Sequence, residues 1–291
     1  MSKTIIDIFK RKYASFVYRM SLRNFRFFER LGVHVTPVHF YSPIPDTRQY
    51  GASLFSREFP MDGVNLDAQG QLSTLSAVYS EYVEEFTPYV NTGLSLADSF
   101  VLYCMIRHYK PRQMVEVGAG ETTKISLLAL ERNLQDGHEY TFTSIEPYPR
   151  EDLLDLDNPR FRLIAKKVEM LDVSFFAETD MLFIDSSHVS RLGSDVNFEI
   201  LEVVPSLKKG AVVHWHDITI PTNYWQDWAH DGNKFWNESY MLHAFLLFND
   251  AFRVVWASRY MFLKHEKELK RYFPFMKDDE RCTSFWLFRE K

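Results

Sequence analysis

A chain of 291 residues, 46% apolar and 25% charged, is long enough for one α/β domain of ordinary size plus an extension. Its net charge of −5 argues against nucleic acid as a partner, because phosphate contacts require concentrated Lys and Arg. The two cysteines, Cys104 and Cys282, lie far apart and outside any metal-ligand spacing, so we expect a reduced, cytoplasmic protein.

The first thirty residues combine an apolar stripe with an excess of positive charge. Their apolar side chains recur at helical spacing: Ile5, Phe9, Tyr13, Phe16, Val17 and Met20. The segment lacks the continuous apolar core of a signal peptide, and no run is long enough to cross a bilayer. One interpretation is a helix on the anionic inner face of the membrane. The other is a helix that docks on its own domain or on a second subunit of a homo-oligomer.

Helices and loops are predicted before the first strand. Residues 39–51 combine prolines and a glycine with aromatic side chains, which is typical of an ordered loop. Residues 72–86 have a helical pattern. Residues 94–109 have a stronger one, which Pro111 ends.

From Pro111 onward, short apolar runs alternate with helical patterns, which indicates βαβ units and a parallel sheet. The predicted strands are residues 114–117, 140–145, 161–165, 181–184, 211–214, 252–257 and 284–288. The predicted helices are residues 122–131, 195–204 and 237–249. We therefore expect an N-terminal extension, residues 1–93, followed by a doubly wound α/β domain, residues 94–291.

The sharpest motif follows the first strand, at residues 115–123 (VEVGAGETT). Gly118 and Gly120 permit a tight turn and let a ligand lie against bare backbone. Glu116 in the strand would repel a phosphate, and it suits a cationic ligand with an amino group. A Gly-x-Gly pair alone is weak evidence for a ligand site, because it also occurs in tight strand-to-helix turns without a ligand.

The second strand ends in Glu146, where an acid can accept both hydroxyls of an adenosine ribose. The alternative is that Glu146 only caps a loop. A NAD-dependent oxidoreductase would also place an acid on the ribose. The missing third glycine and the position of Glu116 count against that enzyme class.

Together these residues resemble the class I S-adenosylmethionine-dependent methyltransferases, which have a Rossmann-like, seven-stranded, mostly parallel sheet. In that family the acid-x-Gly-x-Gly turn holds the methionine part of the cofactor, and the acid after the second strand holds the ribose. The third glycine is Thr122 here, a common variation, and adenine is contacted near Val168 and Glu169. The resemblance implies that the cofactor residues are Glu116, Gly118, Gly120, Thr122, Glu146, Val168 and Asp185.

Ionisable side chains also follow the fourth strand (residues 183–188, FIDSSH) and the fifth (residues 213–217, VHWHD). Both strand ends open at the same edge of a doubly wound sheet. A hydroxyl acceptor has a high pKa, so methyl transfer to it needs a general base or a divalent cation. We predict His188 as the base and His216 as the next choice. Asp185 and Asp217 would orient the acceptor or a metal.

Asp185, His216 and Asp217 look like the metal ligands of the catechol-type, magnesium-dependent members of the superfamily. His216 departs from that pattern, because imidazole suits zinc, iron or manganese better than magnesium. A divalent metal and a metal-free histidine base therefore remain competing interpretations. In a third interpretation, these histidines only bind loop backbone.

The chain from residue 94 onward, with residues 40–46 (FYSPIPD), resembles a bacterial methyltransferase family associated with sugar and surface-polysaccharide biosynthesis. The aromatic and polar residues predicted over the site are Tyr224, Trp225, Trp228, Trp236, Asn237 and Glu238. Flat aromatic side chains with polar neighbours suit binding to the apolar face of a sugar ring. We expect an O-methyltransferase acting on a glycan or small-molecule hydroxyl; a non-catalytic, cofactor-binding scaffold in a biosynthetic complex is the alternative.

Overall fold

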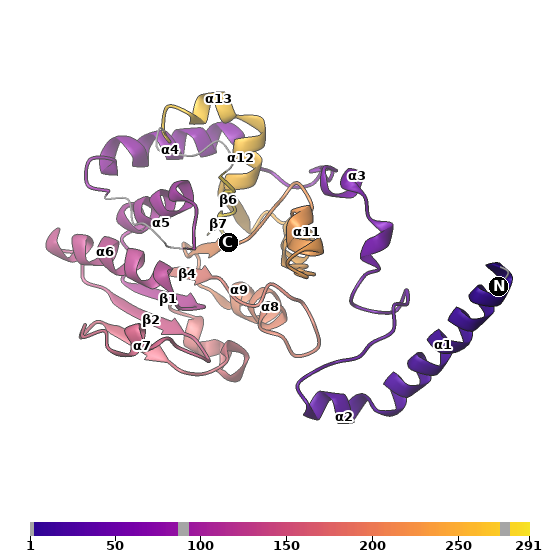
Figure 1. Ribbon diagram of the computed structural model, residues 1–291. Helices are drawn as coiled ribbons and strands as arrows, with labels where there is room; N and C mark the ends of the chain where they lie inside the picture. The colour runs from indigo at the N-terminus through magenta and orange to yellow at the C-terminus, as the bar shows by residue number, and fades with distance from the viewer. Residues whose placement is uncertain (1–2, 87–92, 274–279) are drawn as a thin grey trace. The chain divides into compact units, whose positions relative to one another are not determined.

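The computed structural model describes residues 3–86, 93–273 and 280–291, with side chains described from residue 12 onward (Figure 1). The chain divides into two compact units. Unit 1 comprises Met1–Phe55 and Trp225–Phe235, and unit 2 comprises Ser56–Tyr224 and Trp236–Lys291. Unit 2 begins before the predicted boundary at residues 93 and 94, because helix α4 (Ala68–Tyr82) packs into its core.

Unit 1 contains only short helices apart from its first. The elements are α1 (Lys3–Arg23), α2 (Phe25–Arg30), η1 (Thr47–Gln49), α3 (Ala52–Phe55) and α10 (Gln226–His230). Residues 39–51, predicted as an ordered loop, are a loop apart from η1, whose first turn is capped by the Asp46 carboxylate. Among the described residues, no helix has the length and apolar character that a membrane span needs.

Unit 2 is built on a sheet to which the described residues contribute seven strands. These are β1 (Gln113–Val117), β2 (Thr141–Ile145), β3 (Phe161–Ile164), β4 (Met181–Ile184), β5 (Val212–Trp215), β6 (Phe252–Ala257) and β7 (Phe285–Arg289). Their spatial order is β3-β2-β1-β4-β5-β7-β6, and β7 is antiparallel to both of its neighbours. The predicted fold, a Rossmann-like and mostly parallel sheet of seven strands, is confirmed.

Helices cover both faces of this sheet, as a doubly wound fold requires. Along β1, Met114 points into one apolar cluster and Val115 into the other, because side chains alternate between the faces of a strand. The first face is covered by α4, α5 (Leu96–Tyr109), α6 (Glu121–Gln135), α12 (Ser258–Lys264) and α13 (Glu266–Leu269). The second is covered by η3 (Val173–Phe176), α8 (Asp195–Phe198), η4 (Glu199–Val203), α9 (Val204–Ser206) and α11 (Glu238–Leu246).

Two further short helices, α7 (Glu151–Leu154) and η2 (Val168–Met170), follow β2 and β3. The predicted helix over residues 195–204 forms as α8, η4 and α9, and its middle turn, η4, is π-helical. Strands β4 and β6 begin and end at the predicted residues. Helices α12 and α13 were not predicted.

A buried carboxylate fastens α5 to the far end of the chain. Asp98 lies in the first turn of α5 and is fully buried. It accepts hydrogen bonds from the backbone N–H groups of Thr283 (2.7 Å) and Ser284 (3.2 Å) and from the hydroxyl of Ser258 (2.6 Å). The start of β7 is therefore fixed by a residue of the first helix of the predicted domain.

Candidate active site

Parallel pairing brings the carboxyl ends of the central strands to one level. The register aligns the last residues of β2, β1, β4 and β5, which are Ile145, Val117, Ile184 and Trp215. The residues that follow them form one row: Glu146, Gly118, Asp185 and His216. Side chains that the sequence places in four separate motifs therefore meet at one edge of the sheet.

The turn between β1 and α6 depends on Gly118. This residue has a φ of +87°, and a Cβ at this position would overlap the carbonyl oxygen of Asp185. Only glycine satisfies both conditions. Gly120 is different: its φ of −167° is extended backbone, and a Cβ there would meet open space.

Glu116 lies under this turn and is not among the residues that line the cavity at the strand ends, which is described below. Its carboxyl group is fully buried and accepts hydrogen bonds from the hydroxyls of Thr122 (2.7 Å), Thr123 (2.6 Å) and Ser144. Burial raises its pKa to about 7, and the three hydroxyls oppose that rise. Glu116 and Thr122, both predicted to bind the cofactor, therefore tie the glycine turn to α6 and β2.

This pKa predicts how stability depends on pH. A carboxyl group whose pKa rises from 4.5 to about 7 on folding stabilises the protein fully below pH 4.5, and this contribution is lost as pH rises to about 7. Relative to Glu116→Gln, the wild type should lose about 3 kcal/mol of unfolding free energy over that interval. Urea unfolding of both proteins at pH 5 and pH 8 measures the difference. Equal changes in the unfolding free energy of the two proteins between these pH values would contradict the raised pKa of Glu116.

A cavity of about 320 Å³ opens beside the row of strand ends. Four of the predicted cofactor residues line it: Gly118, Glu146, Val168 and Asp185. One carboxylate oxygen of Glu146 accepts a hydrogen bond from the backbone N–H of Tyr148 (2.8 Å). This bond orients the carboxylate, and within the described part of the chain no hydrogen bond to its other oxygen is found. That oxygen can accept from a ligand hydroxyl.

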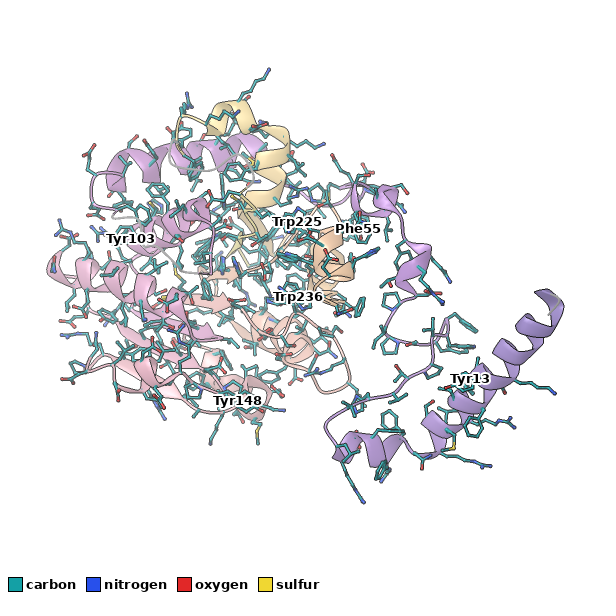
Figure 2. The ribbon with its side chains drawn as sticks, viewed as in Figure 1. Tyr13, Phe55, Tyr103, Tyr148, Trp225 and Trp236 are labelled. Carbon is teal, nitrogen blue, oxygen red and sulfur yellow. The ribbon has the colours of Figure 1, made fainter. Side chains whose placement is uncertain are left out.

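Several other residues line the cavity although no sequence motif indicated them. They include Tyr148, Lys167 and Arg191; Ser187 of the motif at residues 183–188 and Asp195 of the predicted helix over residues 195–204 also line it. Tyr148 is 80% exposed, and Figure 2 shows it at the periphery of unit 2. Its position after Glu146 was the only signal that could have indicated it. Lys167 and Arg191 come from two different loops that only the fold brings together.

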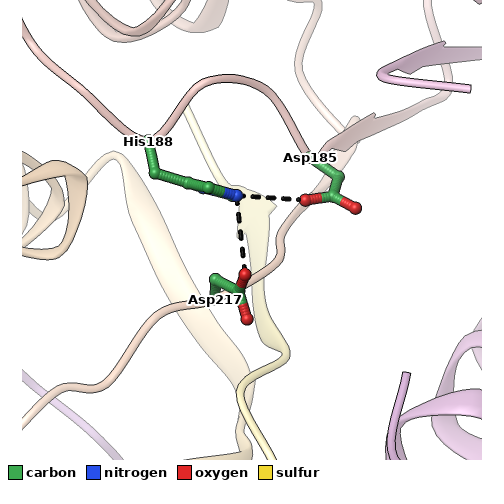
Figure 3. A group of neighbouring side chains, drawn as sticks. All are labelled: Asp185, His188 and Asp217. Atoms are coloured by element: carbon green, nitrogen blue, oxygen red, sulfur yellow. Dashed lines mark ion pairs between the residues drawn. The ribbon is translucent and has the colours of Figure 1, made fainter. Parts of the chain in front are cut away.

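At the Asp185 side of this cavity, His188 contacts three carboxylates. Its Nε2 lies 3.3 Å from Oδ1 of Asp185 and 3.5 Å from Oδ2 of Asp217 (Figure 3). Its Nδ1 lies 2.8 Å from Oε2 of Glu238, at the start of α11. The His188 ring is buried, and the Glu238 side chain is completely so. The Asp185, His188 and Asp217 donor atoms all lie within 4.8 Å of one another.

His216, the second predicted base, lies on the other side of Asp217. Its Nε2 is 3.5 Å from Oδ1 of Asp217, which also accepts a hydrogen bond from the hydroxyl of Thr283 (3.2 Å). His188 and Asp217 have φ values of 60° and 55°. These values lie in the left-handed region, which residues other than glycine rarely adopt. Strained backbone of this kind gathers at functional sites, where the surrounding structure holds it.

The electrostatics of His188 follow from its neighbours. Burial disfavours the imidazolium ion, but hydrogen bonds to Asp185 and Glu238 outweigh it and hold the pKa of His188 well above its ordinary value. The pKa of Asp185 is lowered despite burial, through its hydrogen bond to His188 and the charge of His216. The cluster therefore has an excess of carboxylates, and it favours a cation beside Asp185 and Asp217.

Of the aromatic residues predicted over the site, Trp236 lies beside His188, with ring centroids 4.3 Å apart (Figure 2). Tyr224 packs edge-on against Trp236 and is buried. Asn237 accepts a hydrogen bond from the backbone N–H of Ser190 (2.6 Å), which fixes the loop after His188. Trp225 and Trp228 belong to unit 1 and contact each other there.

Comparison with known proteins gives a family match over the centre of unit 2. Residues 115–218 match the model of a family described as a methyltransferase domain. An uncharacterized protein from Archaeoglobus fulgidus is 32% identical over 162 residues, which are 48% of this chain and 71% of that protein. The family match over residues 115–218 includes the glycine turn, Glu146, His188 and Asp217, but not Glu238.

Two similar solved structures are methyltransferases. One is an SAH-bound methyltransferase of Podospora anserina, with 14% identity, a TM-score of 0.44, and coverage of 88% of this chain and 100% of that one. The other is the O-methyltransferase TomG from Streptomyces achromogenes in complex with SAM, with 12% identity, a TM-score of 0.44, and coverage of 78% of this chain and 92% of that one.

Proposed function

Because this chain belongs to the S-adenosylmethionine-dependent methyltransferases, we propose that it methylates a hydroxyl group of a polar small molecule or sugar. The observation that carries the proposal is the continuity of two sites. Glu146, Gly118 and Val168 line the cavity in which the cofactor would lie, and Asp185 lines that cavity and also contacts His188. The cofactor supplies a methyl group bound to a positively charged sulfur.

The residues around His188 supply what a hydroxyl acceptor needs. The acceptor oxygen bonds the methyl carbon as the carbon–sulfur bond breaks, so the hydroxyl proton must leave. His188 is the group we assign to remove it. Because its pKa is raised, only the neutral fraction of His188 can accept this proton, so we expect the rate of transfer to increase with pH. Glu238 holds the ring through Nδ1, which leaves Nε2 facing Asp185 and Asp217. Asp217 would orient the acceptor hydroxyl toward this nitrogen.

The same donors also fit a divalent cation. Two carboxylates and one imidazole nitrogen converge, and Glu238 at the other ring nitrogen is the outer partner that metal-bound histidines commonly have. Asp185, His188 and Asp217 would hold the ion, with His188 rather than the predicted His216 closest to both carboxylates. A mixed set of this kind suits manganese, iron or zinc, and the ion would acidify the acceptor hydroxyl.

The aromatic surroundings support a ring-shaped acceptor. Trp236 is half-buried beside His188, so part of its side chain remains accessible. Aromatic side chains bind the apolar faces of sugars, while nearby carboxylates accept from sugar hydroxyls. We place the reaction in the reducing cytoplasm, because the sequence has only two cysteines and they lie far apart in the chain.

Cofactor binding tests this function directly. We expect calorimetric titration of S-adenosylmethionine into the purified protein to give a micromolar Kd. Glu146→Gln should weaken binding about 10-fold to 100-fold, because a neutral amide accepts ribose hydroxyls less strongly than a carboxylate. The exposed Glu178→Gln lies outside the cavity and should bind as the wild type does.

The same titration separates the competing interpretations. Repeating it with manganese and then with a chelator shows whether the cluster around His188 holds an ion that contributes to cofactor binding. Methyl transfer to a panel of sugars and phenols then distinguishes an enzyme from a scaffold that only binds. Absence of binding under all conditions would contradict the proposal.

A further inference from the structure

The N-terminal stretch exposes much apolar surface. Among the described side chains, more than half of the large apolar ones that are exposed lie between positions 13 and 50. Phe16 is 56% exposed, and Phe40 and Tyr41 are exposed by 80% and 82%. Figure 2 shows Tyr13 on α1 within this stretch. Such a concentration of exposed apolar side chains indicates a binding surface rather than ordinary solvent-facing structure.

On α1 this surface is a stripe. Tyr13, Phe16, Val17 and Met20 are spaced by three, four and seven residues, so they lie on one face of the helix, and each is at least 40% exposed. A second row runs along one border of the stripe. Its members are Lys12, Arg19 and Arg23, which are also exposed.

Positive charge is concentrated in the same segment. Residues 1–30 contain eight Lys and Arg residues against two acidic ones, a net charge of +6 in a chain whose total is −5. The rest of the chain therefore carries a net charge of −11. A partner complementary to this helix must be apolar at the stripe and anionic at its border.

We propose that α1 binds the surface of an anionic lipid membrane, with its axis in the plane of the interface. The stripe would enter the boundary between headgroups and acyl chains, and the basic side chains would reach the lipid phosphates. Tyr13 combines an apolar ring with a polar tip, which suits this boundary. The competing occupant is a second copy of this chain, whose acidic unit 2 could attract the same basic residues.

Flotation of the full chain with vesicles tests the proposal. We expect it to float with vesicles of phosphatidylglycerol and phosphatidylcholine (3:7) and not with phosphatidylcholine alone. Raising NaCl from 0.1 to 0.5 M should weaken binding at least tenfold, because salt screens the attraction.

Two variants that change the net charge equally test which face of α1 binds the membrane. Phe16→Asp, in the stripe, should weaken binding roughly 10-fold to 100-fold, because it removes an aromatic ring that the membrane would bury. Tyr18→Asp also replaces an exposed aromatic residue with an acid, but three-residue and four-residue spacing puts it outside the stripe. Its binding should stay within about threefold of the wild type. Far-ultraviolet circular dichroism and cofactor titration check that both variants fold.

Three outcomes would overturn the proposal. The protein could fail to float with either vesicle, or both variants could lose binding equally. In the third outcome, light scattering shows that the wild type is a dimer and that Phe16→Asp is a monomer, and the wild type does not bind vesicles. That result would assign the stripe to a second copy. None of these outcomes depends on the acceptor or on methyl transfer.

Discussion

His188→Gln should lower kcat for methyl transfer by about 10²-fold to 10⁴-fold while leaving the Kd for S-adenosylmethionine within a few-fold of the wild type. Glutamine keeps a polar side chain among Asp185, Asp217 and Glu238, so the fold should survive. It cannot accept a proton at ordinary pH. The measurement is single-turnover transfer to an acceptor identified in the hydroxyl panel, together with calorimetric titration of the cofactor.

Two variants define what this result means. Glu238→Gln keeps the shape of the side chain but removes its charge. It should lower kcat about 10-fold to 100-fold with little change in KM, because Glu238 orients the His188 ring and stabilises its charged form but would not contact the acceptor. His138→Gln makes the same substitution at an exposed loop residue and should have no effect. Full activity of His188→Gln would move proton removal to Asp217 or His216.

Gly118→Ala should abolish measurable cofactor binding and lower the unfolding free energy by about 3 kcal/mol or more. The added Cβ must overlap the Asp185 carbonyl oxygen, so either β1 or the end of β4 must shift. Gly118, after β1, and Asp185, after β4, both line the cavity, and Asp185 also contacts His188. A single methyl group would therefore disturb both halves of the site. Urea unfolding and calorimetric titration measure the two effects.

Gly137 provides a matched control for this substitution. Its φ of +88° is almost the same as that of Gly118, but a Cβ there meets nothing within 4 Å. Gly137→Ala should lower the unfolding free energy by about 1–2 kcal/mol, which is the cost of the left-handed backbone conformation alone. It should bind the cofactor normally. Equal losses in the two variants would show that backbone conformation, rather than the contact with Asp185, makes glycine necessary at position 118.

Much of the site could be predicted because strand ends of a parallel sheet share an edge. Glu146, Gly118 and Asp185 each follow an apolar run, and that pattern is visible in the sequence. The role of Glu238 was not predictable in this way, because it lies on α11, fifty residues after His188, and only the packing of that helix brings it to Nδ1. The sequence also could not rank His188 above His216 as the residue closest to Asp185.

The fold was predicted less well outside the sheet. The apolar pattern of α4 identified a helix, but Leu75 and Val78 do not reveal which core they enter. The boundary placed at residue 94 therefore separated α4 from the unit to which it belongs. Glu116 shows a similar limit: the motif identified the residue, but whether its carboxyl group faces a ligand or three hydroxyls depends on the conformation of the turn.

The order of the strands constrains the order of events during synthesis. Strand β7 is made after β6 but lies between β5 and β6, so until residues 285–289 have left the ribosome β6 has no strand partner and β5 has only β4. Asp98 is made long before the backbone donors of Thr283 and Ser284, and burying it earlier would leave an unpaired charge. The β7–β6 edge of the sheet must therefore assemble after translation of β7, while the β1–β4 half, whose strand ends line the candidate cofactor cavity, can form during elongation.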